Sequence, residues 1–338
     1  GAADVGTRDP IKLAVADGTI SSVALTSSSG AVIAGTLSPD KRSWSATEQL
    51  GYAKTYTWSG SATGADGKAV PITGSFRTVE PNRTIGANLN VGDGSTYGVA
   101  MPIVLTFDHP VTDKASVQKA LSVQTSVPTT GAWAWLSDYS VHWRPETYWK
   151  AGTKVTVAAN IYGVSFGNGD FGGDDVSAKF TIGADQVVKG NTKTHRLQLF
   201  QNGKLVQDFP TSYGLDSDPG RNTHSGIHVV MAKNQTYSMS NPKYHYKNVI
   251  VHWATRISNN GEFVHAYDET TWAQGEKNVS HGCANLTTDR AKFFFDWAEI
   301  GTPVDIEGSA VKLGPADGDY YDWTLDWAAW TSKSALSS

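Results

Sequence analysis

The sequence predicts a mainly β protein built from several sandwich-like domains. Three observations support this fold class. Glycine is raised to 34 of 338 residues, and charged residues fall to 18%, below the usual quarter. Short β-prone stretches also alternate with turn sequences over most of the chain. The length exceeds that of one ordinary domain, so we expect two or three domains that each bury a core.

The first part of the chain predicts two consecutive sandwich domains. The turn Ala65-Asp66-Gly67 precedes a closing strand whose last residues, 76–79, resemble a second closing strand over 180–182. The two closing strands begin about 100 residues apart, which is the length of one sandwich domain. This weak internal repeat predicts domains over 1–81 and 82–183.

Two features of the second domain carry further expectations. Trp133, Trp135 and Trp143 are in phase on alternating positions, so one strand face can hold them, and we expect them to pack in the core. The Gly- and Asp-rich segment 166–175 has the composition of a calcium loop. It lacks the D-x-D-x-D-G spacing and the closing Glu, so we expect a flexible hairpin loop without a metal.

After residue 190 the pattern changes to longer hairpins. Asn202-Gly203 is a strong turn signal, and the stretches 196–201 and 204–209 on either side of it read as strands. A second hairpin is expected from the stretches 248–257 and 262–267. The two hairpins predict a further β domain in this region.

One amphipathic helix is expected near the end of that region. Thr287 or Thr288 is the expected N-cap, and Gly301 is the expected stop signal. Apolar residues recur at helical spacing and would face the sheet: Ala291, Phe294, Phe295 and Ala298.

Composition excludes several classes of function. The net charge of -4 and the lack of a Lys/Arg cluster argue against a nucleic-acid partner. The greasiest stretch, 293–295, is interrupted by Asp296, so no transmembrane segment is expected. A single cysteine excludes an internal disulfide and a cysteine-only metal site. The opening Gly1-Ala2-Ala3-Asp4 reads as a trimmed mature end.

The most informative string is Ser280-His281-Gly282-Cys283-Ala284-Asn285, with His265 upstream at the end of a predicted strand. A thiol attacks as the thiolate, so a catalytic cysteine needs a base within reach, and two histidines supply candidates. An adjacent imidazole would hold the pKa of the thiol below about 8.5. Gly282 permits an unusual backbone angle, and two successive amides near the thiol would form an oxyanion hole.

This string and its upstream histidine resemble the catalytic signature of L,D-transpeptidases, bacterial enzymes that cross-link peptidoglycan. The resemblance covers about residues 184–330, and the preceding sandwiches look like the immunoglobulin-like domains of actinobacterial members. It implies two immunoglobulin-like β-sandwich domains, then a catalytic β-sandwich with one helix over 184–312. A Trp-rich segment over 313–338, with Trp323, Trp327 and Trp330 on one helical face, is expected to pack on the catalytic domain.

The resemblance also implies a role for each site residue. Cys283 would be the nucleophile, His265 its base, and His281 a residue that lines the site and orients substrate. The amides of Gly282 and Cys283 would hold the oxyanion. Ala266 stands where many members have a serine whose carbonyl orients the base, and Glu269 stands where some have a flap tryptophan. The remaining residues implied to orient substrate or brace the loop are Ser280, Asn285, His228 and Trp272.

The reaction implied by the resemblance is a two-step acyl transfer without a metal or organic cofactor. The thiolate would attack a tetrapeptide stem after its third residue, a diamino acid, and release D-alanine. The side-chain amine of a second stem would then resolve the thioester, and carbapenems would acylate the same cysteine. The location implied is extracytoplasmic, in the cell wall or periplasmic space, with a membrane anchor in the precursor.

Several alternatives stay open at this level. With water as acceptor the enzyme would be an L,D-carboxypeptidase. A sortase-like transpeptidase also has His before Cys and an Arg after it, as Arg290 is here, but its T-L-x-T-C string is absent. A papain-like peptidase would need the string C-G-S-C-W ahead of its histidine, and this sequence lacks that string. A wall-binding protein with an inactive catalytic domain is the non-enzymatic alternative. His224 and His228 have a zinc-like spacing, but Gly226 and the β context favour an ordinary strand pair.

Overall fold

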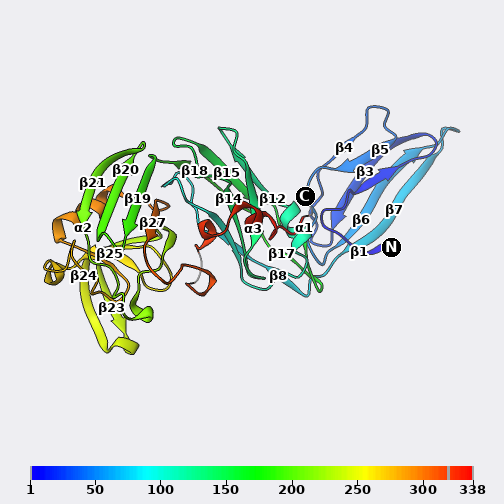
Figure 1. Cartoon of the computed structure of the whole chain (residues 1–338). Helices are drawn as coiled ribbons and strands as arrows, with labels where there is room; N and C mark the ends of the chain where they lie inside the picture. Colours follow the sequence, from blue (N-terminus) through cyan, green and yellow to red (C-terminus); the bar gives the residue numbers. More distant parts are fainter. Residues whose placement is uncertain (1, 318–319, 337–338) are drawn as a thin grey trace. The chain divides into compact units, whose positions relative to one another are not determined.

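The structure is a computed structural model that describes residues 2–317 and 320–336. It is mainly β, as the sequence predicts, and it separates into two compact units (Figure 1). The first unit comprises 1–86 with two inserted segments, 108–120 and 160–175. No helix of the described residues is both long and apolar enough to cross a membrane.

The first unit contains a β-sandwich with its own core. Leu25, Trp44 and Tyr56 are buried in the core of this sandwich, whose two sheets are mainly antiparallel. One sheet has the order β1 (Ala2–Val5), β7 (Ala69–Thr78), β6 (Thr55–Thr63), β3 (Thr19–Ser27). The other has the order β2 (Lys12–Ala14), β5 (Ser43–Ala46), β4 (Gly35–Leu37). The predicted closing strand over 76–79 is confirmed as the end of β7.

The same unit holds a small third sheet, and the hairpin expected over 166–175 is confirmed as part of it. Its order is β16 (Ser165–Gly167), β17 (Asp170–Gly172), β8 (Arg83–Ile85), and the helix α1 (Lys114–Lys119) packs on it. Asn168 and Gly169 both have positive φ and close a tight turn between β16 and β17. The Gly-rich composition therefore serves a turn, and the residues beside it pair as strands.

The second unit begins with another pair of four-stranded sheets. One has the order β10 (Thr96–Tyr97), β18 (Val176–Ile182), β15 (Lys154–Ala159), β12 (Leu121–Thr125). The other has the order β13 (Gly131–Trp135), β14 (Ser140–Pro145), β11 (Ile103–Phe107), β9 (Ala87–Leu89). Trp133, Trp135 and Trp143 are all buried, which confirms their predicted core position.

Two further sheets and a helix follow in residues 186–307. The first sheet has the order β21 (Lys204–Pro210), β20 (Arg196–Gln201), β19 (Gln186–Asn191), β27 (Pro303–Glu307), β22 (Gly226–Val229). The second has the order β23 (Ala232–Asn241), β24 (Tyr246–Arg256), β25 (Phe263–Ala266), β26 (Ala284–Leu286). The predicted hairpins are confirmed as β20–β21 and β24–β25.

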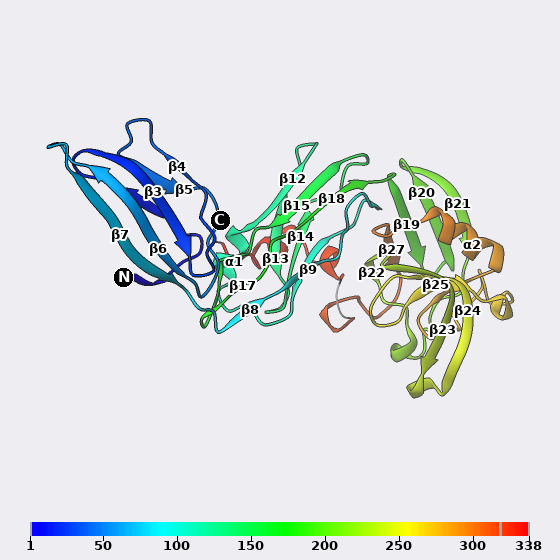
Figure 2. The ribbon, with the colours of Figure 1, turned by 180° about the vertical axis from the view of Figure 1, so that it is seen from behind.

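The helix α2 (Thr288–Trp297) supplies the core that joins these two sheets. It contacts β24 and β25 (Figure 2). Its Phe293 meets Phe209 of β21 with ring centroids 5.9 Å apart. Ala291 and Phe294 are fully buried, as the helical spacing predicts. The helix ends at Trp297, a turn earlier than expected, because Ala298 already has extended backbone angles.

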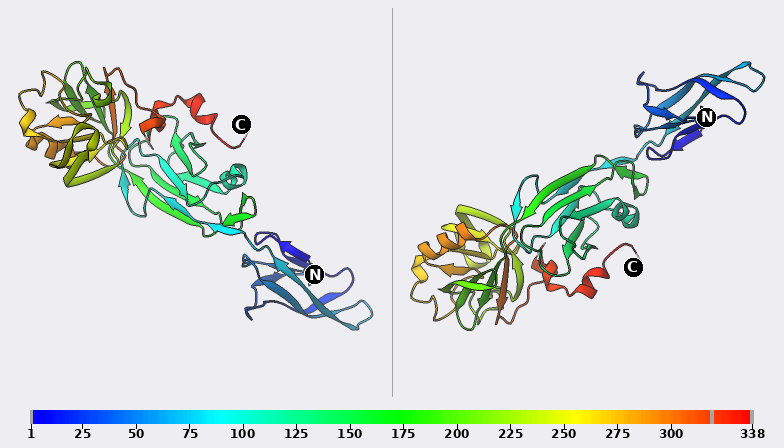
Figure 3. Two further views of the ribbon diagram at one scale, coloured as in Figure 1. Left: turned by 90° about the horizontal axis from the view of Figure 1, so that it is seen from below. Right: turned by 90° about the horizontal axis from the view of Figure 1, so that it is seen from above.

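The expected packing of the C-terminal segment on the catalytic domain is confirmed only in part, because its last helix packs on the sandwich. Arg144 of β14 lies under three tryptophan rings, 4.6 to 5.4 Å from their centroids, and Trp330 Nε1 donates to the Ala132 carbonyl of β13. Cation–π stacking stabilises the charge of that buried guanidinium. The two ribbon views in Figure 3 show the C-terminal segment running beside the sandwich. The helix is α3 (Trp327–Thr331). Earlier in the segment, η5 (Asp322–Thr324) contacts β22, and Asp317 binds His224 and Asn260. The boundaries 1–81, 82–183, 184–312 and 313–338 stay predictions.

Candidate active site

Strand pairing brings the predicted base and nucleophile to neighbouring strands. β25 carries His265, and β26 begins one residue after Cys283. The two strands are parallel, with Val264 opposite Ala284 and His265 opposite Asn285. The chain between them passes through η3 (Asp268–Thr270) and a loop, and this connection places the Cys loop beside β25.

The loop before the nucleophile is held by two side chains. Ser280 Oγ donates to the Cys283 carbonyl at 2.6 Å and accepts from the Gly282 amide at 3.1 Å. Thr223 Oγ1 donates to the Gly282 carbonyl at 2.8 Å. Gly282 has φ +119°, a conformation that favours glycine. Because Ser280 occupies the Gly282 amide, the expected oxyanion role of that amide does not hold in this structure.

His265 is arranged as a neutral base. Its Nδ1–H donates to the Ala266 carbonyl at 3.0 Å, which leaves Nε2 without a proton. The ring is almost fully buried, and burial lowers its pKa to about 4, against a smaller opposing effect of the Ala266 hydrogen bond. At neutral pH the ring is therefore an uncharged imidazole.

Cys283 is a neutral thiol, which corrects the expectation of an activated thiolate. Burial raises the pKa of the thiol to about 12, and the Glu262 carboxylate adds to that rise. The thiol donates to the Gly261 carbonyl, with Sγ 3.7 Å from the oxygen. No hydrogen bond joins it to His265 among the described residues. Desolvation outweighs the two effects that lower this pKa, the Phe263 backbone hydrogen bond and the charge of Arg256.

One cavity of about 210 Å³ brings most of the predicted residues together. Five of the predicted residues line it: His265, Ser280, His281, Cys283 and Asn285. A second wall comes from β23 and β24, which the sequence analysis missed although Val249 and Val251 alternate there. The remaining lining residues are Met239, Tyr246, Val249, Val251, Tyr267, Thr270 and Val279.

Two polar residues face this cavity in different ways. His281 is exposed and lies between the rings of Tyr244 and Tyr246, at 5.1 and 5.2 Å between centroids. Asn285 is buried, and its Nδ2 donates to Thr270 Oγ1 at 3.3 Å. The buried Oδ1 of Asn285 has no partner among the described residues, so it is available to a donor in the cavity.

Four predicted site residues do not line the cavity: Gly282 and Ala266, which adjoin residues that do, and His228 and Trp272. His228 is 0% exposed and its imidazole binds Glu262, so it does not reach substrate. It lies there because β22 pairs with β27 in the other sheet. Trp272 is 61% exposed, and the Lys277 ammonium sits 4.3 Å from its ring centroid. Trp272 does not line the cavity, and its expected contact with substrate stays a prediction.

The fold and the cavity define a cysteine enzyme. A neutral thiol, an imidazole with a free Nε2 and an open amide oxygen meet in one largely apolar cavity beside β25 and β26. These are the parts that thiol-based acyl transfer needs.

Comparison with known proteins identifies the family. Residues 185–306 match the L,D-transpeptidase catalytic domain, and residues 2–165 match the bacterial Ig domain. L,D-transpeptidase 5 of Mycobacterium tuberculosis is 49% identical over 99% of this chain and 75% of that protein. L,D-transpeptidase 2 of the same species is 36% identical over 99% of this chain and 83% of that protein. The chain belongs to the L,D-transpeptidase family and is an enzyme.

Solved structures agree with this assignment. The L,D-transpeptidase LdtMt1 in complex with imipenem superposes with a TM-score of 0.56 at 29% identity, covering 66% of this chain and 99% of that one. L,D-transpeptidase 3 of Mycobacterium tuberculosis, in complex with a faropenem-derived adduct, gives a TM-score of 0.53 at 25% identity over 65% and 97%. Family membership sets aside the sortase-like, papain-like and inactive wall-binding alternatives.

Proposed function

We propose that this enzyme transfers an acyl group from a tetrapeptide stem of peptidoglycan to the side-chain amine of a second stem. The observation that carries the proposal is the cavity shared by Cys283, His265 and Asn285. The roles that the sequence analysis assigns to these residues stay predictions. The substrate lies outside the cytoplasm, so we also propose an extracytoplasmic site of action, in the cell wall or periplasmic space.

Acylation begins from two neutral groups. The thiol leaves the Gly261 carbonyl, and His265 Nε2 takes its proton as sulfur attacks the carbonyl carbon of the third residue. The oxyanion of the tetrahedral intermediate accepts a hydrogen bond from the Cys283 amide. Collapse breaks the peptide bond, and His265 returns the proton to the departing amine of D-alanine. The product is a thioester on Cys283.

The second step reverses the proton path. The side-chain amine of the second stem enters the cavity and attacks the thioester carbonyl. His265 removes a proton from the attacking nitrogen and returns it to sulfur as the carbon–sulfur bond breaks. Asn285 Oδ1 accepts a hydrogen bond from a backbone N–H of the bound stem, and His281 lines the entrance beside the two tyrosines.

The test is incubation of the purified chain with a disaccharide tetrapeptide, followed by mass spectrometry of the products. The expected products are free D-alanine and a dimer joined through third-position residues. Tripeptide without dimer would instead identify an L,D-carboxypeptidase. Intact mass after incubation with a carbapenem is expected to show one adduct on Cys283, and an unmodified chain would contradict that part of the proposal.

A further inference from the structure

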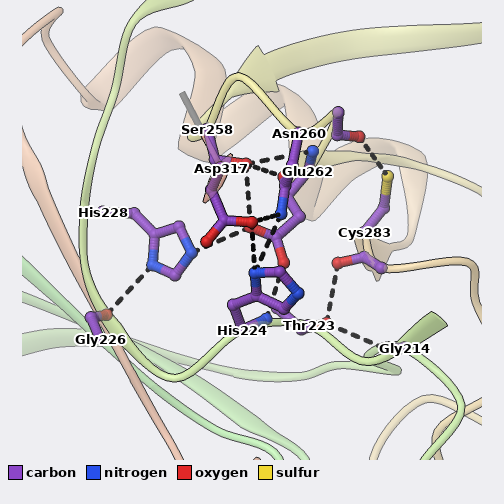
Figure 4. A network of polar contacts seen from close by, with 12 residues as sticks. Gly214, Thr223, His224, Gly226, His228, Ser258, Asn260, Glu262, Cys283 and Asp317 are labelled. Carbon is purple, nitrogen blue, oxygen red and sulfur yellow. Dashed lines mark hydrogen bonds and ion pairs between the residues drawn. The ribbon is translucent and has the colours of Figure 1, made fainter. Parts of the chain in front are cut away.

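A buried polar network lies beside the loop that carries the nucleophile (Figure 4). At its centre is Glu262, only 3% exposed, in the turn between β24 and β25. Its Oε2 binds His228 Nε2 at 3.0 Å and accepts from Ser258 Oγ at 2.9 Å. Its Oε1 accepts from the His224 amide at 2.7 Å. A buried carboxylate needs such partners, because an unpaired one is costly to desolvate.

His228 carries the charge that balances this carboxylate. Its Nδ1 faces the Gly226 carbonyl at 3.1 Å, and its Nε2 faces Glu262. Both neighbours are acceptors, so both ring nitrogens donate and the ring is an imidazolium. Burial alone would raise the pKa of Glu262, but hydrogen bonds and charge from His228, with the His224 amide, bring it below its ordinary value. The two side chains form a buried ion pair.

The backbone on either side of Glu262 faces the sulfur atom. The Gly261 carbonyl accepts the thiol proton, with 3.7 Å between sulfur and oxygen. The Phe263 amide donates toward the same sulfur, and this hydrogen bond favours the thiolate. The residue before Glu262 therefore accepts the hydrogen bond of the protonated thiol, and the residue after it stabilises the thiolate. The Glu262 side chain anchors the short segment that carries both groups.

We infer that Glu262, held by the His228 imidazolium, is a positioning residue that keeps the Gly261 carbonyl and the Phe263 amide in place beside Cys283. The inference rests on the proposed function for its consequence in acyl transfer. Neither side chain lines the cavity, so their effect reaches substrate only through the sulfur.

The ion pair matters because attack moves sulfur from one backbone partner toward another. At rest the thiol proton is held by the Gly261 carbonyl, and as the proton leaves, negative charge develops beside the Phe263 amide. A fixed amide stabilises that charge without reorganising. A segment free to shift by about 1 Å would lose on the order of a hundredfold in rate.

The experiment compares Glu262→Ala with Glu262→Gln in the full chain. Gln keeps the shape and the network: its oxygen accepts from the His224 amide, and its Nε2–H donates to a neutral His228 that still donates from Nδ1. Ala removes the anchor. The readout is carbapenem acylation followed by intact mass, which separates the first-order acylation rate, the apparent inhibition constant and the final adduct amount.

We expect Glu262→Ala to acylate on the order of a hundredfold more slowly. The apparent inhibition constant should stay within about threefold and the final adduct should still be stoichiometric, which partial unfolding would not allow. Glu262→Gln should stay within about threefold of the parent rate. Asp322→Ala is the matched control, because Asp322 is also a buried carboxylate bound to a histidine, His142, at 2.8 Å. It should lower the melting temperature without slowing acylation.

Three results would overturn the inference: a parent-like rate in Glu262→Ala, a Glu262→Gln rate as low as that of Ala, or equal slowing in Asp322→Ala. Alkylation of Cys283 by iodoacetamide keeps the test separate from the proposed function, because it requires no turnover. If the parent chain forms no carbapenem adduct, that part of the proposed function fails. The inferred positioning role of Glu262 then still predicts that the alkylation rate of Glu262→Ala differs by more than about threefold from the rates of the parent and of Glu262→Gln. Equal alkylation rates in the three proteins would refute the inference.

Discussion

The imidazole of His265 donates its Nδ1–H to the backbone carbonyl of the next residue, Ala266, at 3.0 Å. A backbone carbonyl is present whatever the side chain, so this bond sets the histidine tautomer without a hydroxyl at position 266. It leaves Nε2 free to accept the thiol proton. Alanine at position 266, in place of the serine that the resemblance leads one to expect, therefore leaves this hydrogen bond to His265 unchanged.

Ala266→Ser is accordingly expected to leave the acylation rate within about threefold of the parent. The carbonyl already orients the ring, and the buried site offers the new hydroxyl no required role. Stopped-flow acylation by a carbapenem measures this directly. A gain of tenfold or more would show that a hydroxyl at this position takes part in orienting the base.

Cys283→Ala should abolish both cross-linking and the carbapenem adduct while the melting temperature changes little. His265→Ala should slow acylation by at least about a hundredfold, as expected for loss of a general base. Product analysis and intact mass measure both. A Cys283→Ala chain that still forms the adduct would remove the cysteine from the reaction.

Alkylation of the resting thiol should rise with pH without a plateau near neutrality. Burial raises the pKa of Cys283 to about 12 and lowers that of His265 to about 4, so the thiolate fraction keeps increasing well above pH 9. The rate with iodoacetamide between pH 5 and pH 10 shows the profile. A plateau reached near pH 7 would instead reveal a thiolate–imidazolium pair at rest.

Folding stability should fall as the pH is lowered from about 6.5 to about 4. The unfolded chain protonates His265 near the ordinary pKa of 6.5, whereas the folded chain resists until about 4. The unfolded state therefore binds more protons in this window, and the free energy of unfolding decreases with falling pH. Urea melts of the parent and of His265→Gln measure the difference, which should shrink in the variant. Parallel pH dependence in the two proteins would contradict this.

Trp330→Ala should destabilise the sandwich that the C-terminal helix covers, by about 3–5 kcal/mol, the usual cost of removing a buried aromatic ring. Trp330 is fully buried, and its indole donates to the Ala132 carbonyl. Thermal melts measure the loss, while carbapenem acylation at 25 °C should be unchanged in the folded fraction. Equal melting temperatures would mean that the helix adds little. The same contact argues against a clean truncation to residues 184–338, which would expose these tryptophans.

The sequence by itself determined the β architecture, the hairpins, the helix and the reactive string around Cys283. These follow from local patterns: turn residues such as Asn202-Gly203, helical spacing such as that of Ala291 and Phe294, and a motif whose residues adjoin one another. Each is settled by interactions among residues close in the chain, so reading the chain in order is enough to find them.

Only the tertiary structure decided the electrostatic state of the site and the roles of distant residues. Burial makes Cys283 and His265 neutral, and burial depends on every segment that packs around them. His228, expected to contact substrate, instead binds Glu262, because its strand pairs with β27 in the other sheet. The C-terminal tryptophans pack against Arg144, and their rings stabilise its buried charge by cation–π contacts. Contacts between residues far apart in sequence depend on how the sheets pack, and no local pattern records that packing.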